Sequence, residues 1–388
     1  MKIRKLAALA LTIPLCLTGC SDFWDKPIPP TPPTTLSSGF FYVLNFATSE
    51  VAGFYVNKGV LTDATGSPTT LSAKPIAITV APNNAFLYVS TLSGIYLYTV
   101  AASTGQITLA NSTLAISADQ AASMQVDSTN SWLIEGVTGS PNLFAIRISP
   151  TNGTVVESIP ASVALPGSNI QQIAISPDNK YVYVALGTAG TAVVPFNAGD
   201  NNPFGSVSTI SAKSSAGGAI SVAVDPITPT TTTPRLFYIG ETAVTSGNNT
   251  GGLRAFNYGT VQEISGSPFA INGLAPSSIL PFSTGNFVYV VNRQVSGSST
   301  GVITGFSIAA SDSTFTLTAL GSTFTAGTNP QSMVEDSTGS FVFVVNFGGS
   351  PDLIGYTINS TNAGYLDKVI SSATGTDPVN AIQVAGLH

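Results

Sequence analysis

A short run of aromatic and β-branched residues recurs seven times along this sequence, and this repeat constrains the fold more than any other feature. Successive runs start 46, 46, 49, 55, 51 and 54 residues apart. A period of roughly 40 to 50 residues is typical of chains that build one supersecondary unit per repeat. The runs start at Phe40, Phe86, Trp132, Tyr181, Leu236, Phe287 and Phe341.

Each repeat contains four strand-like segments separated by turn residues. In the repeat around Tyr181, "IQQIAISPDN" precedes the run "YVYVAL", and "TAVVPF" and "GSVSTI" follow it. Four short strands in about 50 residues, with Gly, Pro, Asn and Asp between them, indicate one blade of a propeller. The sequence therefore predicts an all-β fold, a seven-bladed β-propeller of four-stranded blades.

The two ends of the repeat region complement each other. The chain enters the array at a second strand, Phe40, and its last segment, Val379 to Val384, has the pattern of a first strand. These N- and C-terminal strands complete one blade only if they share it, and that pairing removes exposed sheet edges. We expect one propeller domain over residues 39–388, closed in this way.

Composition excludes several other classes of protein. Charged residues are only 8% of the chain, with 37 Gly, 25 Pro and a mean hydropathy of +0.33. Disorder requires low hydrophobicity and high charge, and a helical bundle requires many charged residues on its solvent faces. Basic residues number 13 against 19 acidic ones. This deficit argues against a nucleic acid partner, because binding to nucleic acid depends on Lys and Arg contacts to phosphate.

The first 20 residues resemble a bacterial lipoprotein signal peptide. "MKIRK" is positively charged, "LAALALTIPLCL" is apolar, and Leu17-Thr18-Gly19-Cys20 has the order of a lipobox. The resemblance implies cleavage before Cys20 and attachment of lipid to that cysteine, so that the protein contacts a membrane through its anchor. An ordinary secretory leader with a chance cysteine is the alternative.

The predicted anchor sets the N-terminal organisation and the location. Residues 1–19 form the signal peptide, and residues 20–38 form a Pro-rich tether of extended character. Cleavage removes Cys16 and leaves Cys20 as the only cysteine, so no internal disulfide can form. We expect an extracytoplasmic, lipid-anchored protein of the cell envelope, and Ser21 after the cysteine favours the outer membrane.

Several repeat segments are similar to those of a known family. "SPDNKYVYV", "STGNFVYVVN" and "DSTGSFVFVVN" resemble the YVTN-type repeats of the bacterial seven-bladed β-propeller lactonases. The resemblance extends over nearly all of residues 39–388. Some members of that family are 6-phosphogluconolactonases, so the resemblance implies hydrolysis of a sugar lactone. A shared fold does not by itself carry an activity, which depends on site residues.

Alignment of the first strands gives two columns of residues. One column is expected in the core between blades: Ile78, Met124, Ile173, Val222, Ile279, Met333 and Ala381. Because side chains alternate faces, the neighbouring column should point into the central channel: Ala77, Ser123, Gln172, Ser221, Ser278, Ser332 and Asn380.

This second column holds no acid, histidine or cysteine, whereas lactone opening needs a general base or a metal-bound water. The only histidine is His388, which we expect to be a frayed terminus. No spacing predicts a metal site, and none predicts a cofactor.

Polar residues end four consecutive second strands at one mouth of the predicted channel. Asn45, Asn292 and Asn346 are candidate ligand-binding residues for a small polar or sugar-like molecule. Glu241 ends the remaining strand, and Arg293 follows Asn292. A lactonase would use Glu241 as the base and Arg293 as the oxyanion partner. The structural alternative is that Asn ends strands because it tolerates turn geometry.

Other charged and aromatic residues are expected to be structural. Asp127, Asp178, Asp225 and Asp336 fall in the turns between first and second strands, at the opposite face. Arg147 and Arg254 lie on third strands and should face solvent or pair between blades, and the repeated Phe and Tyr residues should pack in the core.

The sequence leaves three functions open. The scarcity of proton-transfer groups favours a lipid-anchored binding or interaction module. The alternatives are a lactone hydrolase and a scaffold for envelope assembly, whose partner would be an envelope protein.

Overall fold

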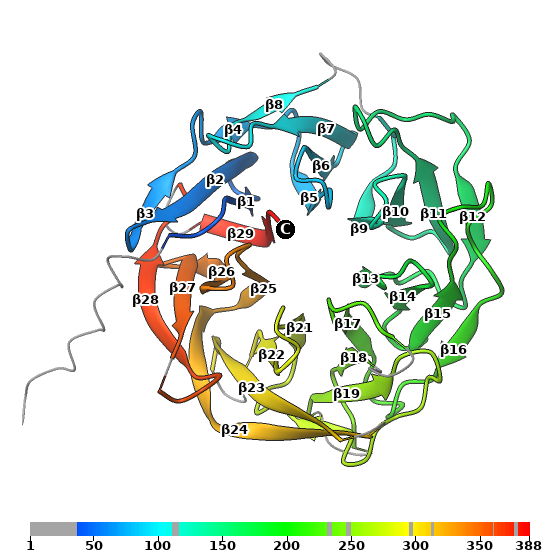
Figure 1. Ribbon diagram of the computed structural model, residues 1–388, viewed down its shortest axis with the longest axis vertical. Helices are drawn as coiled ribbons and strands as arrows, with labels where there is room; N and C mark the ends of the chain where they lie inside the picture. Colours follow the sequence, from blue (N-terminus) through cyan, green and yellow to red (C-terminus); the bar gives the residue numbers. More distant parts are fainter. Residues whose placement is uncertain are drawn as a thin grey trace, which may run out of the picture.

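The computed structural model forms a ring of seven sheets around a central axis (Figure 1). It describes residues 37–110, 116–230, 235–245, 250–294, 298–311, 314–359, 361–375 and 379–388. All regular elements in this part of the chain are strands, which confirms the predicted all-β seven-bladed propeller. No helix among these residues has the length and hydropathy of a membrane span. The signal peptide, Cys20 and the tether up to residue 36 lie outside the described residues.

Each blade is an antiparallel sheet whose inner strand lies at the ring centre (Figure 1). Blade 1 contains β29 (Val379–Gly386), β1 (Phe41–Asn45), β2 (Glu50–Asn57), β3 (Val60–Asp63) and β4 (Thr69–Thr70). Blade 2 contains β5 (Pro75–Val80), β6 (Phe86–Thr91), β7 (Gly94–Val100) and β8 (Ile107–Leu109). Blade 3 contains β9 (Ala121–Val126), β10 (Trp132–Val137), β11 (Asn142–Arg147) and β12 (Ala161–Ala164).

The other four blades follow in chain order. Blade 4 contains β13 (Gln172–Ile175), β14 (Tyr181–Ala185), β15 (Thr191–Pro195) and β16 (Ser208–Ile210). Blade 5 contains β17 (Ala219–Val224), β18 (Leu236–Glu241), β19 (Gly252–Asn257) and β20 (Phe269–Ala270). Blade 6 contains β21 (Pro276–Pro281), β22 (Phe287–Asn292), β23 (Thr300–Ser311) and β24 (Thr314–Thr328). Blade 7 contains β25 (Pro330–Glu335), β26 (Phe341–Gly349), β27 (Leu353–Ile358) and β28 (Leu366–Ser372).

The ring closes through the two ends of the repeat region, as predicted. Strand β29 pairs with β1, with Val384 opposite Val43. The start of β29 also pairs with the end of β26, where Asn380 lies opposite Phe347. The two ends of the repeat region therefore meet within blade 1, and the start of β29 also links blade 1 to blade 7.

The pairing of β29 with β1 corrects the predicted register of the last strand. The register shifts between Leu44 and Asn45, so that Leu44 lies opposite Gln383 and Asn45 opposite Ala381. In blade 2 the residue at the place of Leu44 is Ser90, which lies opposite Ala77. The channel column therefore ends at Gln383 and not at Asn380. In the same alignment, the column of core residues ends at Val384 and not at Ala381.

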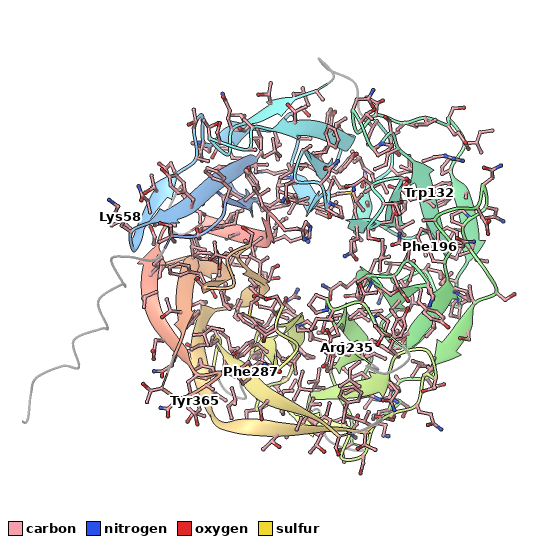
Figure 2. All side chains as sticks on the ribbon, viewed as in Figure 1. Lys58, Trp132, Phe196, Arg235, Phe287 and Tyr365 are labelled. Carbon is pink, nitrogen blue, oxygen red and sulfur yellow. The ribbon has the colours of Figure 1, made fainter. Side chains whose placement is uncertain are left out.

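The core lies between neighbouring blades, where the apolar faces of their sheets meet. Phe41 of blade 1 stacks on Phe343 of blade 7 with ring centroids 3.9 Å apart. Trp132 of blade 3 and Phe196 of blade 4 belong to one buried cluster (Figure 2). These contacts confirm that the repeated aromatic residues are core residues, whose burial drives folding.

Aspartates organise the turns between inner and second strands, on the face that we call the Asp face. Asp127 Oδ1 accepts hydrogen bonds from the backbone N–H groups of Ser131 and Trp132, at 2.8 and 2.6 Å. Asp336 forms the equivalent turn of blade 7, and its Oδ2 also accepts from the N–H of Gly39 at 3.2 Å. The chain therefore enters the propeller at the Asp face.

Candidate functional site

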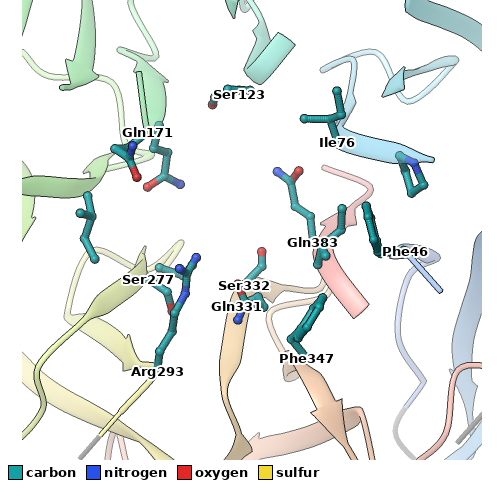
Figure 3. Close-up of a pocket in the computed structure, with 16 residues that line it drawn as sticks. Phe46, Ile76, Ser123, Gln171, Ser277, Arg293, Gln331, Ser332, Phe347 and Gln383 are labelled. Atoms are coloured by element: carbon teal, nitrogen blue, oxygen red, sulfur yellow. The ribbon is translucent and has the colours of Figure 1, made fainter. Parts of the chain in front are cut away.

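A cavity of about 480 Å³ opens at the ring centre on the face opposite the Asp face, and we call it the mouth pocket (Figure 3). Its lining comes from the starts of the inner strands and the ends of the second strands. The lining residues are Phe46, Pro75, Ile76, Ala122, Ser123, Gln171, Gln172, Ile220, Ser277, Ser278, Arg293, Gln331, Ser332, Phe347, Ile382 and Gln383. This size suits a small organic ligand.

Polar side chains of the inner strands form hydrogen bonds from blade to blade. Gln172 Oε1 accepts from the N–H of Val222, and Gln383 Oε1 accepts from the N–H of Ile78, both at 3.0 Å. Ser123 Oγ accepts from the N–H of the next inner strand in the same way. Members of the predicted channel column therefore line the central cavity, and their oxygen atoms also bridge neighbouring blades.

The bridges decide which groups remain for a ligand. An amide whose oxygen is bound to a backbone N–H still has its NH₂ group, and a serine that accepts one bond can still donate its hydroxyl hydrogen. Gln172, Gln383, Ser123 and Ser278 all line the mouth pocket while their oxygen atoms accept from backbone N–H groups. The pocket is therefore rich in hydrogen-bond donors.

Arg293 is the single ionisable side chain among the described residues that line the mouth pocket. Its backbone N–H donates to the carbonyl of Ala275 at 2.9 Å, which fixes the position of the main chain. Its exposed guanidinium forms no ion pair or hydrogen bond with any other described residue. The guanidinium keeps its charge and all five N–H donors for a ligand.

An apolar side of the pocket lies across from this arginine. Phe46, Ile76 and Phe347 lie on one side of the pocket, and Gln171, Ser277 and Arg293 lie on the other (Figure 3). Pro75 and Ile382 add to the apolar lining. The pocket therefore combines a donor-rich side with an apolar one.

The three candidate asparagines do not line the mouth pocket. Asn45, Asn292 and Asn346 are fully buried. The Nδ2 atoms of Asn45 and Asn292 donate to the carbonyls of Thr374 and Ile271, at 3.0 and 2.9 Å. These carbonyls lie in the loops that lead into the inner strands of the same blades. Asn45 and Asn292 thus each anchor a loop, which is a structural role other than the turn geometry considered above, whereas neither amide atom of Asn346 has a hydrogen-bond partner among the described residues.

The residue that follows each asparagine faces the pocket instead. Phe46, Arg293 and Phe347 directly follow Asn45, Asn292 and Asn346, and all three line the cavity. The sequence therefore identified the correct strand ends, and it placed Arg293 at the mouth. The sequence analysis did not consider that the residue after each asparagine would line the cavity.

Glu241 is held away from the mouth pocket by other partners. It is 1% exposed, its Oε1 accepts from Arg254 Nη1 at 2.7 Å, and its Oε2 accepts from the N–H of Lys213 at 2.8 Å. Arg254 also pairs with Glu263 at 3.0 Å. Burial alone would raise the pKa of Glu263, but hydrogen bonds from Arg254 and Ser267 lower it to about 2. The structure does not bring Glu241 and Arg293 together. Arg254 pairs with Glu241 and Glu263 of its own blade and also donates to the carbonyl of Ser211, directly after β16 of blade 4.

One acidic residue at an unusual position escaped the sequence argument. Glu135 in β10 is fully buried, and neither carboxyl oxygen has a hydrogen-bond partner among the described residues. Burial, followed by the negative charge of Asp119, raises the pKa of Glu135 to about 8. The signal was present in "WLIEGV", because the other six repeats have an apolar β-branched residue there: Val43, Val89, Val184, Ile239, Val290 and Val344.

The Asp-face end of the channel holds a second cavity, of about 300 Å³, which His388 helps to line. The backbone N–H of His388 donates to Asn84 Oδ1 at 2.8 Å, and its carbonyl accepts from Asn84 Nδ2 at the same distance. His388 is therefore tied to blade 2, which corrects the expectation of a frayed end. The part of the chain that the structure describes holds no cluster of three acidic, histidine or cysteine residues that could bind a metal.

Comparison with known proteins supports the family resemblance. Residues 236–381 match the family model described as "Lactonase, 7-bladed beta-propeller". A search of curated proteins gave no match. Together with the seven observed blades, the family match confirms that this chain resembles the propeller lactonases.

Solved structures share the fold at low sequence identity. A candidate 6-phosphogluconolactonase from Bacteroides fragilis is 14% identical, with a TM-score of 0.65 over 91% of this chain and 99% of its own. A protein from Lactobacillus plantarum is 16% identical, with a TM-score of 0.63 over 90% and 99%. A periplasmic gluconolactonase from Pseudomonas aeruginosa is 13% identical, with a TM-score of 0.60 over 89% and 99%.

Proposed function

We propose that this protein is a binding module that takes a small organic anion in the mouth pocket. The observation that carries the proposal is the guanidinium of Arg293, which pairs with no other described residue and lies in a cavity whose described lining contains no acidic residue. Arginine binds carboxylate and phosphate groups through two parallel hydrogen bonds. The NH₂ groups of Gln172 and Gln383 and the hydroxyls of Ser123 and Ser278 add further donors around it. This set of groups suits the anionic group of such a ligand.

A lactone hydrolase is the alternative function, because the family match and two of the similar structures carry lactonase names. In that role Arg293 would stabilise the oxyanion of the opening lactone. Hydrolysis also needs a group that takes a proton from water, and the described lining of the pocket holds Arg293 alone as an ionisable residue. Glu241 is occupied by Arg254 and Lys213. These observations favour binding over catalysis.

We further propose that lipid on Cys20 anchors the protein in the cell envelope. The lipobox supports this proposal, and so does the chain's entry at the Asp face through Gly39. A tether leaving that face would turn the mouth pocket away from the membrane and toward free ligand. Labelling of cells with a radioactive fatty acid should mark the wild-type chain and not the Cys20→Ala variant. Equal labelling of the two chains would contradict the anchor. An envelope scaffold stays a prediction.

Calorimetric titration tests the binding function directly. Purified protein should bind at least one member of a panel containing gluconate, inorganic phosphate and 3-phenylpropionate. Arg293→Gln should weaken that binding by roughly tenfold or more, because a charge-assisted pair is lost. Arg147→Gln is the matched control, since Arg147 is an exposed arginine paired with Glu157 on blade 3. No binding by any member, or equal effects of the two variants, would contradict the proposal.

The hydrolase alternative needs a separate measurement. A pH-stat assay with glucono-δ-lactone should show no release of acid above the uncatalysed rate. Turnover that is lost in Arg293→Gln and kept in Arg147→Gln would instead establish the enzyme.

A further inference from the structure

The apolar side of the mouth pocket is unlike the aromatic core of the blades. Phe46 is 37% exposed, whereas the core aromatic residues Phe41 and Phe343 are fully buried. Phe46 and Phe347 come from neighbouring blades, and both line the cavity beside Ile76, Pro75 and Ile382 (Figure 3). Large apolar side chains gathered at the mouth of a cavity indicate a surface that a ligand covers.

The backbone of both residues is held in place by the junction that closes the propeller. The N–H of Phe46 donates to the carbonyl of Asn380 at 2.9 Å, and Phe347 is paired with the same Asn380. The N–H of Phe347 also donates to the carbonyl of Asn329 at 3.0 Å. The two aromatic residues therefore share one backbone anchor, which fixes their separation before any ligand arrives. Preorganised contact surface reduces the entropic cost of binding.

Lys74 lies against the turn of Phe46, although it is not among the residues that line the pocket. Its Nζ donates to the carbonyls of Phe46 and Ala47 at 2.8 and 2.7 Å, and it lies 5.3 Å from the centre of the Phe46 ring. Lys74 thus positions the turn that carries Phe46. Its charge and that of Arg293 both favour an anion over a cation.

A fully hydroxylated acid fits this pocket poorly. Hydroxyl groups turned toward Phe46, Phe347 and Ile76 would lose water without gaining hydrogen-bond partners, which is costly. An acid with an apolar body avoids this cost, because its carbon atoms cover the rings while its carboxylate reaches the arginine and the amide donors.

We propose that the anion bound in the mouth pocket is a carboxylic acid with a compact apolar body, aryl or short alkyl. This inference rests on the proposed binding function, because it needs an anion at Arg293. It goes further by assigning the recognition of the body to Phe46 and Phe347.

Titration of the full-length protein with 3-phenylpropionate and with gluconate tests this ligand class. The phenyl acid should bind at least about tenfold more tightly, since a tenfold ratio corresponds to burial of a modest apolar area. Phe46→Ser and Phe347→Ser should each weaken binding of the phenyl acid several-fold and leave gluconate unchanged. Leu92→Ser is the control, because Leu92 holds the position of Phe46 in blade 2, is 53% exposed and does not line the pocket.

The outcomes separate the two proposals. Gluconate binding as tight as that of the phenyl acid, with both losing affinity in Arg293→Gln, would overturn the ligand class and keep the binding function. No binding of either acid or of phosphate would overturn both. Thermal unfolding of each phenylalanine variant shows whether it is folded. If one phenylalanine variant is unfolded, the other variant provides the test. Phe46→Leu and Phe347→Leu keep an apolar side chain and should retain most of the affinity for the phenyl acid.

Discussion

The side-chain oxygen of Gln383 accepts a hydrogen bond from the backbone N–H of Ile78, 3.0 Å away, and so joins the inner strand of blade 1 to that of blade 2. Gln172 and Val222 form the same bridge between blades 4 and 5. Because Gln383 and Gln172 also line the mouth pocket, the groups that hold the ring together are the groups that present donors to a ligand.

Gln383→Met is expected to affect both stability and binding. Loss of the bridge leaves the N–H of Ile78 without this acceptor, which should cost about 1–3 kcal/mol in the free energy of unfolding. Gln125→Met is the control, because Gln125 Oε1 bridges to the N–H of Ile175 at 2.8 Å but does not line the mouth pocket. Urea denaturation should show similar losses for the two variants, and calorimetry should show weaker ligand binding for Gln383→Met alone. Equal ligand affinities of the two variants would contradict a role of the Gln383 side chain in ligand binding.

Arg254→Leu should be among the most destabilising single changes in the protein. It leaves the carboxylate of Glu241 buried without its cation, and breaking a buried pair in this way costs about 3–5 kcal/mol. Arg147→Leu, which removes an exposed pair with Glu157, should cost less than about 1 kcal/mol. Urea denaturation measures both values. Similar values for the two variants would show that the Glu241 pair is not energetically buried.

Glu135 should make the protein less stable as the pH rises. Its pKa is about 8 in the folded chain against 4.5 for the free group, so the folded state holds a proton that the unfolded state releases between these values. Stability is then full below about pH 4.5 and falls by at most about 1.4 kcal/mol per pH unit up to pH 8. Glu135→Val copies the residue of the neighbouring repeats and should flatten this dependence. Denaturation at pH 5, 6.5 and 8 tests it, and identical slopes in both proteins would contradict it.

Gly327→Ala probes the loop that lies against Asn346. The φ of Gly327 is +92°, and an added Cβ would lie 2.8 Å from Cγ of Asn346. Gly259 has a similar φ of +83° with nothing within 4 Å of the added carbon, so Gly259→Ala measures the backbone penalty alone. We expect about 1–2 kcal/mol of destabilisation for Gly259→Ala and clearly more for Gly327→Ala. Equal melting temperatures for the two variants would mean that Asn346 moves freely.

The architecture was accessible from the sequence because each repeat carries its own turn residues and strand pattern. The run at Phe40 and the segment ending at Val384 even predicted the closure. The register of the last strand was not accessible, because the residue pattern does not show which residue of β29 lies opposite Leu44. The same irregularity, one inner-strand residue without a partner, occurs in blades 2, 3, 5, 6 and 7, so it does not distinguish the last strand.

The sequence pointed to the strand ends beside the mouth pocket, but of its candidate side chains only Arg293 lines that pocket. Asn292 was a candidate because it is polar, but its Nδ2 donates to the carbonyl of Ile271. The neighbouring Arg293 lines the cavity instead. Glu241 was a candidate because it is charged, but it forms an ion pair with Arg254 on the next strand. Whether a polar group is free depends on contacts between residues distant in the chain, which a single sequence does not show.

The pairing of β1 with β29 also sets an order of events during synthesis. Strand β1 is made first, and its neighbour in the sheet is made last, so the edge of Phe41–Asn45 stays open until the remaining blades have been translated. Contacts between such distant segments slow folding, and an open edge can pair with another chain meanwhile. A chain truncated before residue 379 would be held in that state, and a synthetic peptide of residues 379–388 supplied in trans would provide the missing strand.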